Sequence, residues 1–80
     1  MRLSAEFTTE PFLAEGDPPA HATEPFEAAR SAGLAADLGP FGTTLSGDGD
    51  DLLAALGPVL AAAFAHGATR VTMRVERADG

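Results

Sequence analysis

The two ends of this 80-residue chain alternate between apolar and polar side chains. The alternation runs over residues 2–9 and again over residues 69–77. Its apolar positions are Leu3, Ala5 and Phe7 in the first segment and Val71, Met73 and Val75 in the last. A period of two predicts a β-strand with one buried face. Because each of these strands needs other elements to cover its apolar face, the segments between them decide the fold.

The first segment with helical spacing covers residues 18–32. Its markers are Asp17 as a candidate N-cap, Pro18 at the first helical position, Ala22, Phe26 and Ala29 on one face, and Gly33 after the last turn. Pro25 conflicts with this pattern, because a proline inside a helix removes one hydrogen bond and costs about 3 kcal/mol. We therefore expect a helix that is kinked or interrupted at Pro25, preceded by a loop over residues 10–19.

The stronger helical pattern lies within residues 47–68. Asp48 or Asp50 is placed to cap its start, where acidic groups also suit the positive end of the helix dipole. The predicted apolar stripe consists of Leu52, Leu56, Val59, Leu60 and Ala63. Gly67 is expected to end the helix, and the pair Gly57-Pro58 to bend it at mid-length.

Between the two helices, residues 34–38 and 43–46 have the pattern of short strands joined by the turn "GPFG". The resulting order is strand, helix, strand, strand, helix, strand, which is typical of the ferredoxin-like α+β fold. We therefore expect a single domain over residues 1–80, with a four-stranded antiparallel sheet and two helices on one of its faces.

The other face of such a sheet is open, and its first and last strands are neighbours. The polar residues expected on this face are Arg2, Ser4, Glu6, Thr8, Arg70, Thr72, Arg74 and Glu76. They form cross-strand ion pairs on a solvated surface, or they meet a second subunit. The small number of large apolar residues in the chain also favours self-association.

The formal net charge of −7 disfavours nucleic acid and anionic membranes as partners, because both attract basic proteins. A cationic or neutral small molecule remains compatible with it. The chain has no cysteine, which excludes disulfides and thiolate chemistry. No apolar run reaches membrane length and no leader precedes the first strand, so we expect a cytoplasmic protein. The absence of Lys, Ile, Asn, Gln, Tyr and Trp favours a GC-rich bacterial genome.

Catalytic and metal sites have little support in the sequence. The acids at 48, 50 and 51 are explained by a helix N-terminus, since they lack the length and terminal Glu of a calcium loop. His66 suits a helix C-terminus. His21 is either a half-buried helical side chain or a polar contact to a ligand near the preceding loop. An enzyme of this fold would need Glu6 or His21 as its acid or base. We expect no catalytic residue and no metal ligand.

Four short motifs carry a resemblance to a known family. They are "EFTTEPF" (6–12), "PPAHA" (18–22), "GPFGTTLSGD" (39–48) and "AHGATRVTMRVE" (65–76). In this order they resemble the thiamine-binding protein family of small ferredoxin-like domains, from Arg2 to Glu76. The resemblance implies a non-enzymatic binder of thiamine or its hydroxymethylpyrimidine part, without another cofactor, that forms dimers or tetramers. Pro25 and Pro58 depart from it, because they interrupt helices that are more regular in the family.

With such a ligand, Phe41 offers an aromatic ring to the flat pyrimidine, and Gly42 allows the backbone to approach closely. The full set of expected binding residues is Glu6, Thr8, His21, Phe41, Gly42, Thr43 and Thr44. Glu6 supplies a carboxylate and the threonines supply hydroxyls. Phe41 either lines the pocket or packs on its neighbours in the turn. The alternative function is a structural or regulatory oligomerisation module that binds no vitamin.

Overall fold

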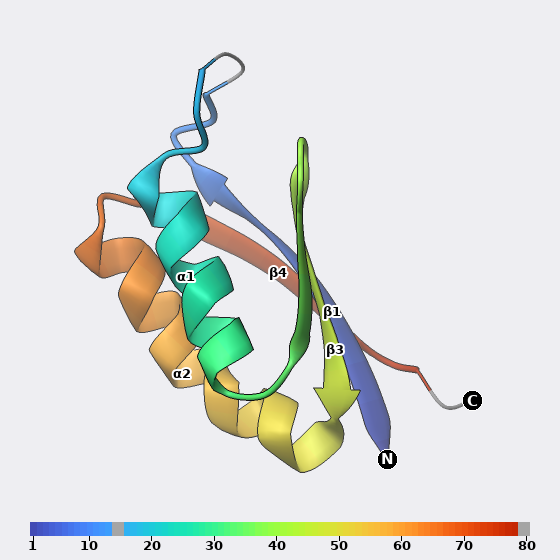
Figure 1. Cartoon of the computed structure of the whole chain (residues 1–80). Helices are drawn as coiled ribbons and strands as arrows, with labels where there is room; N and C mark the ends of the chain where they lie inside the picture. Colours follow the sequence, from blue (N-terminus) through green and yellow to red (C-terminus); the bar gives the residue numbers. More distant parts are fainter. Residues whose placement is uncertain (14–15, 79–80) are drawn as a thin grey trace.

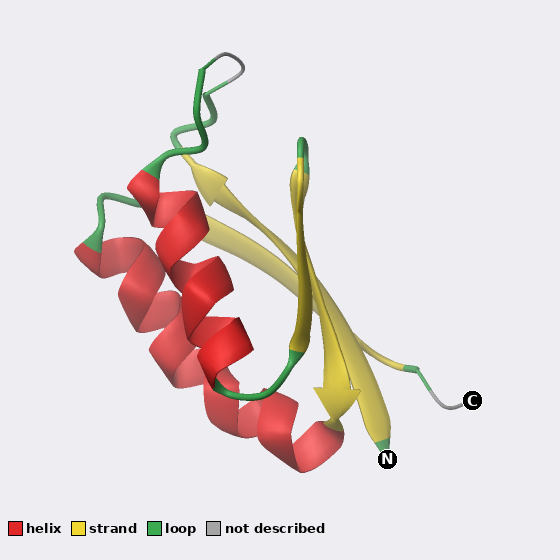
Figure 2. Cartoon of the chain, in the orientation of Figure 1, coloured by secondary structure: helices red, strands yellow, loops and turns green. Residues whose placement is uncertain are grey.

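The computed structural model describes residues 1–13 and 16–78, so residues 14 and 15 of the predicted loop lie outside the described part. Its elements are β1 (Arg2–Glu10), α1 (Ala20–Ser31), β2 (Ala35–Gly39), β3 (Gly42–Asp48), α2 (Gly49–Ala65) and β4 (Arg70–Arg77). The strands form one antiparallel sheet in the order β2-β3-β1-β4. Both helices lie side by side on one face of it (Figure 1, Figure 2). The predicted ferredoxin-like α+β fold is confirmed.

The core lies between this sheet and the helices. Its largest contributors from the sheet are Leu3, Phe7 and Leu45, and those from α2 are Leu52 and Val59. Ala5 is buried between Leu3 and Phe7, so the predicted alternation in β1 is confirmed.

In β4, Val71 and Met73 are half-buried against the core, as expected of an inward row. Val75 pairs with Ala5 and so shares its face of the sheet, yet it is 39% exposed. β4 is an edge strand, and an edge position has a neighbouring strand on one side only. Val75 therefore lies on the inward face, as predicted, but its edge position leaves it exposed.

The start of α1 differs from the prediction. Pro19 occupies the N-cap position and no side chain caps the helix, so the predicted cap at Asp17 is wrong. The helix runs from Ala20 to Ser31 without interruption, so of the two outcomes predicted at Pro25, a kink or an interruption, the interruption is excluded. Pro25 is one of the largest wholly buried side chains. Burial of its ring offsets part of the hydrogen bond that proline cannot make.

The buried face of α1 is also rotated from the predicted one. It contains His21, Pro25 and Ala29, whereas Phe26 is half-buried with the Arg30 guanidinium 5.6 Å from its ring centroid. The predicted face that grouped Phe26 with Ala29 is therefore only partly right. The rotation matters for function, because it turns a histidine inward.

α2 agrees more closely with its prediction. Asp48 is the N-cap, and its carboxylate accepts a hydrogen bond from the backbone N–H of Asp50 at 3.2 Å. The helix continues through Gly57-Pro58. Gly67 ends it with a φ of 106°, and the backbone N–H of the next residue bonds back into the last helical turn. α1 ends in the same way at Gly33, whose φ is 87°. Both glycines occupy the left-handed conformation that favours this residue type.

Candidate functional site

A cavity of about 220 Å³ opens at the end of the sheet where β1 leads into α1. Three segments meet there: the end of β1 with the loop after it, the first turn of α1, and the turn that joins β2 to β3. All three lie at the upper end of the molecule in Figure 1. The β2–β3 turn reaches this end because β3 runs antiparallel to β1, so the start of β3 lies beside the end of β1.

The buried floor of the cavity carries polar side chains beside Phe7, which is 2% exposed. Thr9, His21 and Thr43 line this floor and are 9%, 6% and 2% exposed, respectively. The Oγ1 of Thr9 lies 2.8 Å from Nδ1 of His21, so these two side chains share a hydrogen bond. The Nε2 atom of His21 is buried and has no hydrogen-bond partner among the residues described. The expectation of a half-buried His21 is therefore wrong, because the side chain is almost wholly buried.

The rim of the cavity is apolar and exposed. Phe12, Leu13 and Phe41 line it and are 59%, 55% and 80% exposed. Water-facing aromatic and aliphatic side chains around a polar floor are the usual composition of a small-molecule pocket. Such a rim offers apolar faces to a flat ring, while the floor offers hydrogen bonds to its edge.

Five of the seven residues predicted to bind a ligand line this cavity: Thr8, His21, Phe41, Gly42 and Thr43. Phe41 stands at the tip of the two-residue β2–β3 turn and does not fill the core. At Gly42, an added Cβ would lie 3.0 Å from the carbonyl oxygen of Phe7. Glycine at this position therefore allows β3 to approach β1 closely.

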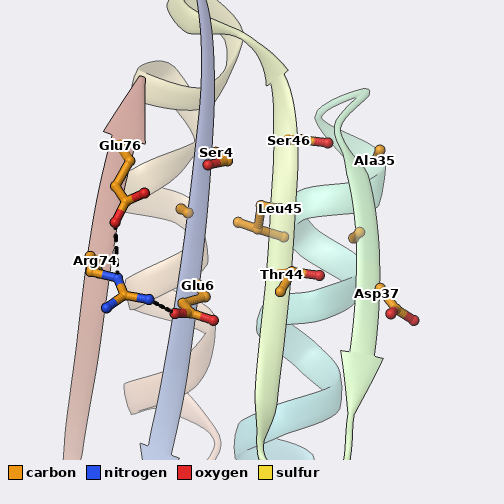
Figure 3. A pocket seen from close by; sticks show the side chains of 11 residues that line it. Ser4, Glu6, Ala35, Asp37, Thr44, Leu45, Ser46, Arg74 and Glu76 are labelled. Carbon is orange, nitrogen blue, oxygen red and sulfur yellow. Dashed lines mark hydrogen bonds and ion pairs between the residues drawn. The ribbon is translucent and has the colours of Figure 1, made fainter. Parts of the chain in front are cut away.

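The other two predicted residues, Glu6 and Thr44, lie on the open face of the sheet (Figure 3). A shallow groove of about 420 Å³ runs over this face. Arg74 from β4 binds the carboxylate of Glu6, and its Nε lies 3.3 Å from Glu76. The predicted cross-strand ion pairs are therefore present. Glu6 does not line the cavity at the end of the sheet, but it lines a second hollow of about 390 Å³ with Thr8, Phe41 and Gly42.

Several charged groups away from the cavity form ion pairs. His66 lies at the end of α2, as predicted, with Nε2 3.6 Å from a carboxylate oxygen of Glu24. Within residues 1–13 and 16–78, no three His, Asp or Glu side chains are placed to hold a metal ion. In the same part of the chain, neither helix has the length and apolar character to cross a membrane.

The sequence model of the family described as "Thiamine-binding protein" matches residues 5–79. The chain belongs to the thiamine-binding protein family. No protein of curated function matches it. The match includes all three segments that form the cavity, so the candidate site lies wholly within the family domain.

Solved structures share the fold of this thiamine-binding family member. A domain of unknown function, DUF77, from Bacillus cereus is 23% identical and superposes with a TM-score of 0.64, covering 94% of this chain and 72% of that one. A Streptococcus pneumoniae protein is 24% identical with a TM-score of 0.68, covering 95% and 83%. A Thermotoga maritima protein described as a candidate for thiamine biosynthesis or salvage is 17% identical with a TM-score of 0.64, covering 95% and 81%. At these identities the likeness concerns the fold alone.

Among the side chains in this family member's cavity that sequence reasoning did not assign to the site are Thr9, Phe12 and Leu13. For Thr9 the sequence held a signal, because it follows Phe7 at the period of the inward row and is the one polar residue in that row. The two rim residues have no such signal. They lie in the loop after β1, where no periodic pattern indicates which way a side chain points.

Proposed function

We propose that this protein binds thiamine without transforming it, and that the cavity at the end of the sheet receives the hydroxymethylpyrimidine half. The observation that carries the proposal is an aromatic rim over a polar, buried floor in a member of the thiamine-binding protein family. The volume of about 220 Å³ is below the ~300–1,000 Å³ typical of ligand pockets, which suits one flat ring better than both rings of thiamine.

The chemistry of the lining fits that ring. The faces of an aminopyrimidine are apolar and stack on aromatic side chains, which Phe12 and Phe41 supply at the rim. Its edge carries nitrogen atoms that need hydrogen bonds, and Thr9, His21 and Thr43 supply polar groups at the floor. The thiazolium half would stay near the rim, where the net charge of −7 favours a cation.

The same lining supports a binder rather than an enzyme. Among the described residues around the cavity, His21 is the one titratable side chain, and no carboxylate, amine or guanidinium accompanies it. General acid–base catalysis usually pairs groups of different proton affinity around the reacting atoms. A single imidazole that is bound to a threonine can position a ligand without a second catalytic group.

Titration calorimetry with thiamine, hydroxymethylpyrimidine and the thiazole alcohol tests this proposal. We expect saturable binding of the first two with one ligand per chain, and no heat from the thiazole half. Far-UV circular dichroism of the same sample checks that the protein is folded. Absence of heat from all three at millimolar concentration would refute a vitamin-binding role, and binding of the thiazole alcohol alone would refute the assignment of the pyrimidine half.

We also propose that the protein self-associates, through the outer side of α2. The segment from Leu52 to Ala65 contains no charged or polar residue, and it exposes half of Leu53 and Phe64. A second copy is the occupant that we propose, because like-charged chains meet with least repulsion at a surface without charges. If the protein assembles but gives no calorimetric heat with thiamine, hydroxymethylpyrimidine or the thiazole alcohol, the alternative function, an oligomerisation module that binds no vitamin, is favoured.

Light scattering after gel filtration tests this arrangement. We expect a dimer or tetramer for the native chain and a monomer for Phe64→Glu. Thr72→Glu, on the open face of the sheet, is the matched control and should leave the assembly intact. Dissociation by Thr72→Glu but not by Phe64→Glu would place the interface on the open face. A monomeric native chain would refute self-association.

A further inference from the structure

The Nε2 atom of His21 is the one side-chain nitrogen or oxygen in the described residues that is buried without a hydrogen-bond partner. The residue is 6% exposed and lines the cavity at the end of the sheet. Buried polar groups in native proteins nearly always have partners, and an exception marks a group whose partner comes from outside the chain or whose strain serves a function. A role for this atom in ligand recognition deepens the proposed function and rests on it.

The bond between Thr9 and His21 indicates which ring nitrogen carries the hydrogen. A threonine hydroxyl has one hydrogen to donate, and within the described residues the 2.8 Å contact to Nδ1 of His21 is its one side-chain partner. When the hydroxyl donates to Nδ1, the hydroxyl hydrogen and the lone pair on Nδ1 are both satisfied by the same hydrogen bond. A neutral imidazole then carries its hydrogen on Nε2. In this arrangement Nε2–H is the one group of the pair without a partner among the described residues, whereas the other tautomer leaves both the hydroxyl hydrogen and Nε2 without one, so the hydrogen-bond count favours Nε2 as a donor.

The surroundings of His21 also favour an acceptor on the ligand. His21 lies in the first turn of α1, which has no side-chain cap and no acidic residue. Helix N-termini present free N–H groups and a partial positive charge, which attract acceptor atoms. The described lining contains no carboxylate that could compete for this donor.

We infer that His21 determines which ring the cavity accepts, by donating a hydrogen bond from Nε2 to a ring nitrogen on the edge of the bound pyrimidine. Thr9 is the positioning residue, since it keeps the imidazole in the tautomer that donates from Nε2. The ring must displace a wall side chain to reach this atom, because Nε2 is shielded from solvent in this structure. A ring of the same shape with a C–H in place of that nitrogen leaves the donor without a partner and is rejected.

Two substitutions of His21 separate its two nitrogens. His21→Asn keeps an amide near the Nδ1 position, so it retains the contact with Thr9 and removes the Nε2 edge. His21→Gln extends an amide to the Nε2 position and keeps a donor there. With hydroxymethylpyrimidine as the probe, we expect His21→Asn to bind about tenfold to a hundredfold more weakly and His21→Gln to retain most of the affinity.

A matching change in the ligand completes a double-mutant cycle with the substitution of His21. A hydroxymethylpyridine analogue, with one ring nitrogen replaced by C–H, should bind the native protein about as weakly as the pyrimidine binds His21→Asn. The analogue should lose little further affinity in His21→Asn, because the bond is already missing. Equal losses that add in full would show that the histidine and the ring nitrogen do not interact, and would overturn the inference.

Nitrogen NMR of the histidine rings tests the tautomer without relying on affinity. We expect His21 to be protonated at Nε2 in the free protein, with its resonance shifted on saturation with hydroxymethylpyrimidine; a His66→Gln sample assigns the signals. Thr9→Val should yield a mixture of tautomers. An Nδ1–H tautomer in the native protein, or an Nε2 resonance that ligand leaves unchanged, would overturn the inference.

These experiments distinguish a failure of the proposed vitamin binding from a failure of the proposed role of His21. If the native protein binds neither thiamine nor hydroxymethylpyrimidine, both are wrong. If it binds them and His21→Asn binds them equally well, the proposed function stands and the role of His21 is refuted. Thermal unfolding of both His21 variants, followed by circular dichroism, shows whether each affinity belongs to a folded protein.

Discussion

Replacing Phe41 with alanine should weaken ligand binding far more than it weakens folding. The side chain is 80% exposed at the tip of the β2–β3 turn, and it lines the cavity. An aromatic side chain removes about 150–250 Å² of its own surface from water when it is fully buried. Since Phe41 is 80% exposed, only about a fifth of that area is buried in the folded chain. At about 25 cal/mol/Å², burial of this area contributes at most about 1 kcal/mol to the free energy of folding.

Phe41→Ala should weaken ligand binding more than folding, because a bound pyrimidine ring would cover much of the Phe41 surface that is now exposed. Covering about half of the side chain contributes about 2 kcal/mol, and stacking of two rings adds a fraction to this. Phe41→Ala should therefore raise the Kd for hydroxymethylpyrimidine by at least about thirtyfold. The control is Leu52→Ala, because Leu52 is 0% exposed, belongs to the core and does not line the cavity. That substitution should cost about 2–5 kcal/mol of folding free energy.

Calorimetry measures the Kd, and urea unfolding followed by circular dichroism measures the folding free energy, since the chain has no tryptophan for fluorescence. An unchanged Kd for Phe41→Ala would remove this residue from the binding site. A loss of folding free energy as large as that of Leu52→Ala would show that Phe41 is covered in the assembled protein and acts in an interface.

Three further substitutions test how the fold supports this site. Gly42→Ala places a methyl group 3.0 Å from the Phe7 carbonyl oxygen and should lower the free energy of unfolding by about 1–3 kcal/mol in urea; an unchanged value would show that β3 moves away at no cost. Arg74→Met removes two exposed ion pairs and should cost less than about 1 kcal/mol, with the difference shrinking in about 1 M salt; a larger, salt-independent loss would show that the open face is covered. Asp48→Ala removes the cap of α2 and should cost about 0.5–2 kcal/mol by thermal unfolding, whereas no change would show that the 3.2 Å bond contributes nothing.

The order of elements was predictable because each is marked by local physics. The inward row Leu3, Ala5 and Phe7 has the period of a strand, and Gly33 and Gly67 mark helix ends that were confirmed. Predictions failed where tertiary burial overrides a local rule. Pro25 is unfavourable inside an isolated helix, but packing of its ring against the core keeps α1 continuous.

The site was predictable in part, for a related reason. Phe41 and His21 stood out because turns and helix faces do not require those residue types. Glu6 and Thr44 were grouped with them because they supply a carboxylate and a hydroxyl. Both line the groove on the open face, where the alternation of β1 had already placed Glu6. Thr8 has the same place in the alternation but lies nearer the end of β1, where it lines the cavity. Position along the strand therefore separates Glu6 from Thr8, and the alternation pattern carries no signal for where the cavity begins.

The cavity is the place where this chain departs from the rules that make a stable core. Thr9 occupies a position where the inward row of β1 favours an apolar residue, and His21 does the same on the buried face of α1. A valine and a leucine there would remove a buried polar pair and an unpartnered nitrogen, and would leave the fold at least as stable. Natural proteins accept such departures at functional sites. A ligand that satisfies Nε2 returns the missing interaction, so its binding should stabilise the folded chain in proportion to the logarithm of its concentration above Kd. Any ligand that binds only the folded chain stabilises it in this way, so the polar pair enters through the Kd and through the choice of ligand, which a hydrogen bond to Nε2 makes selective.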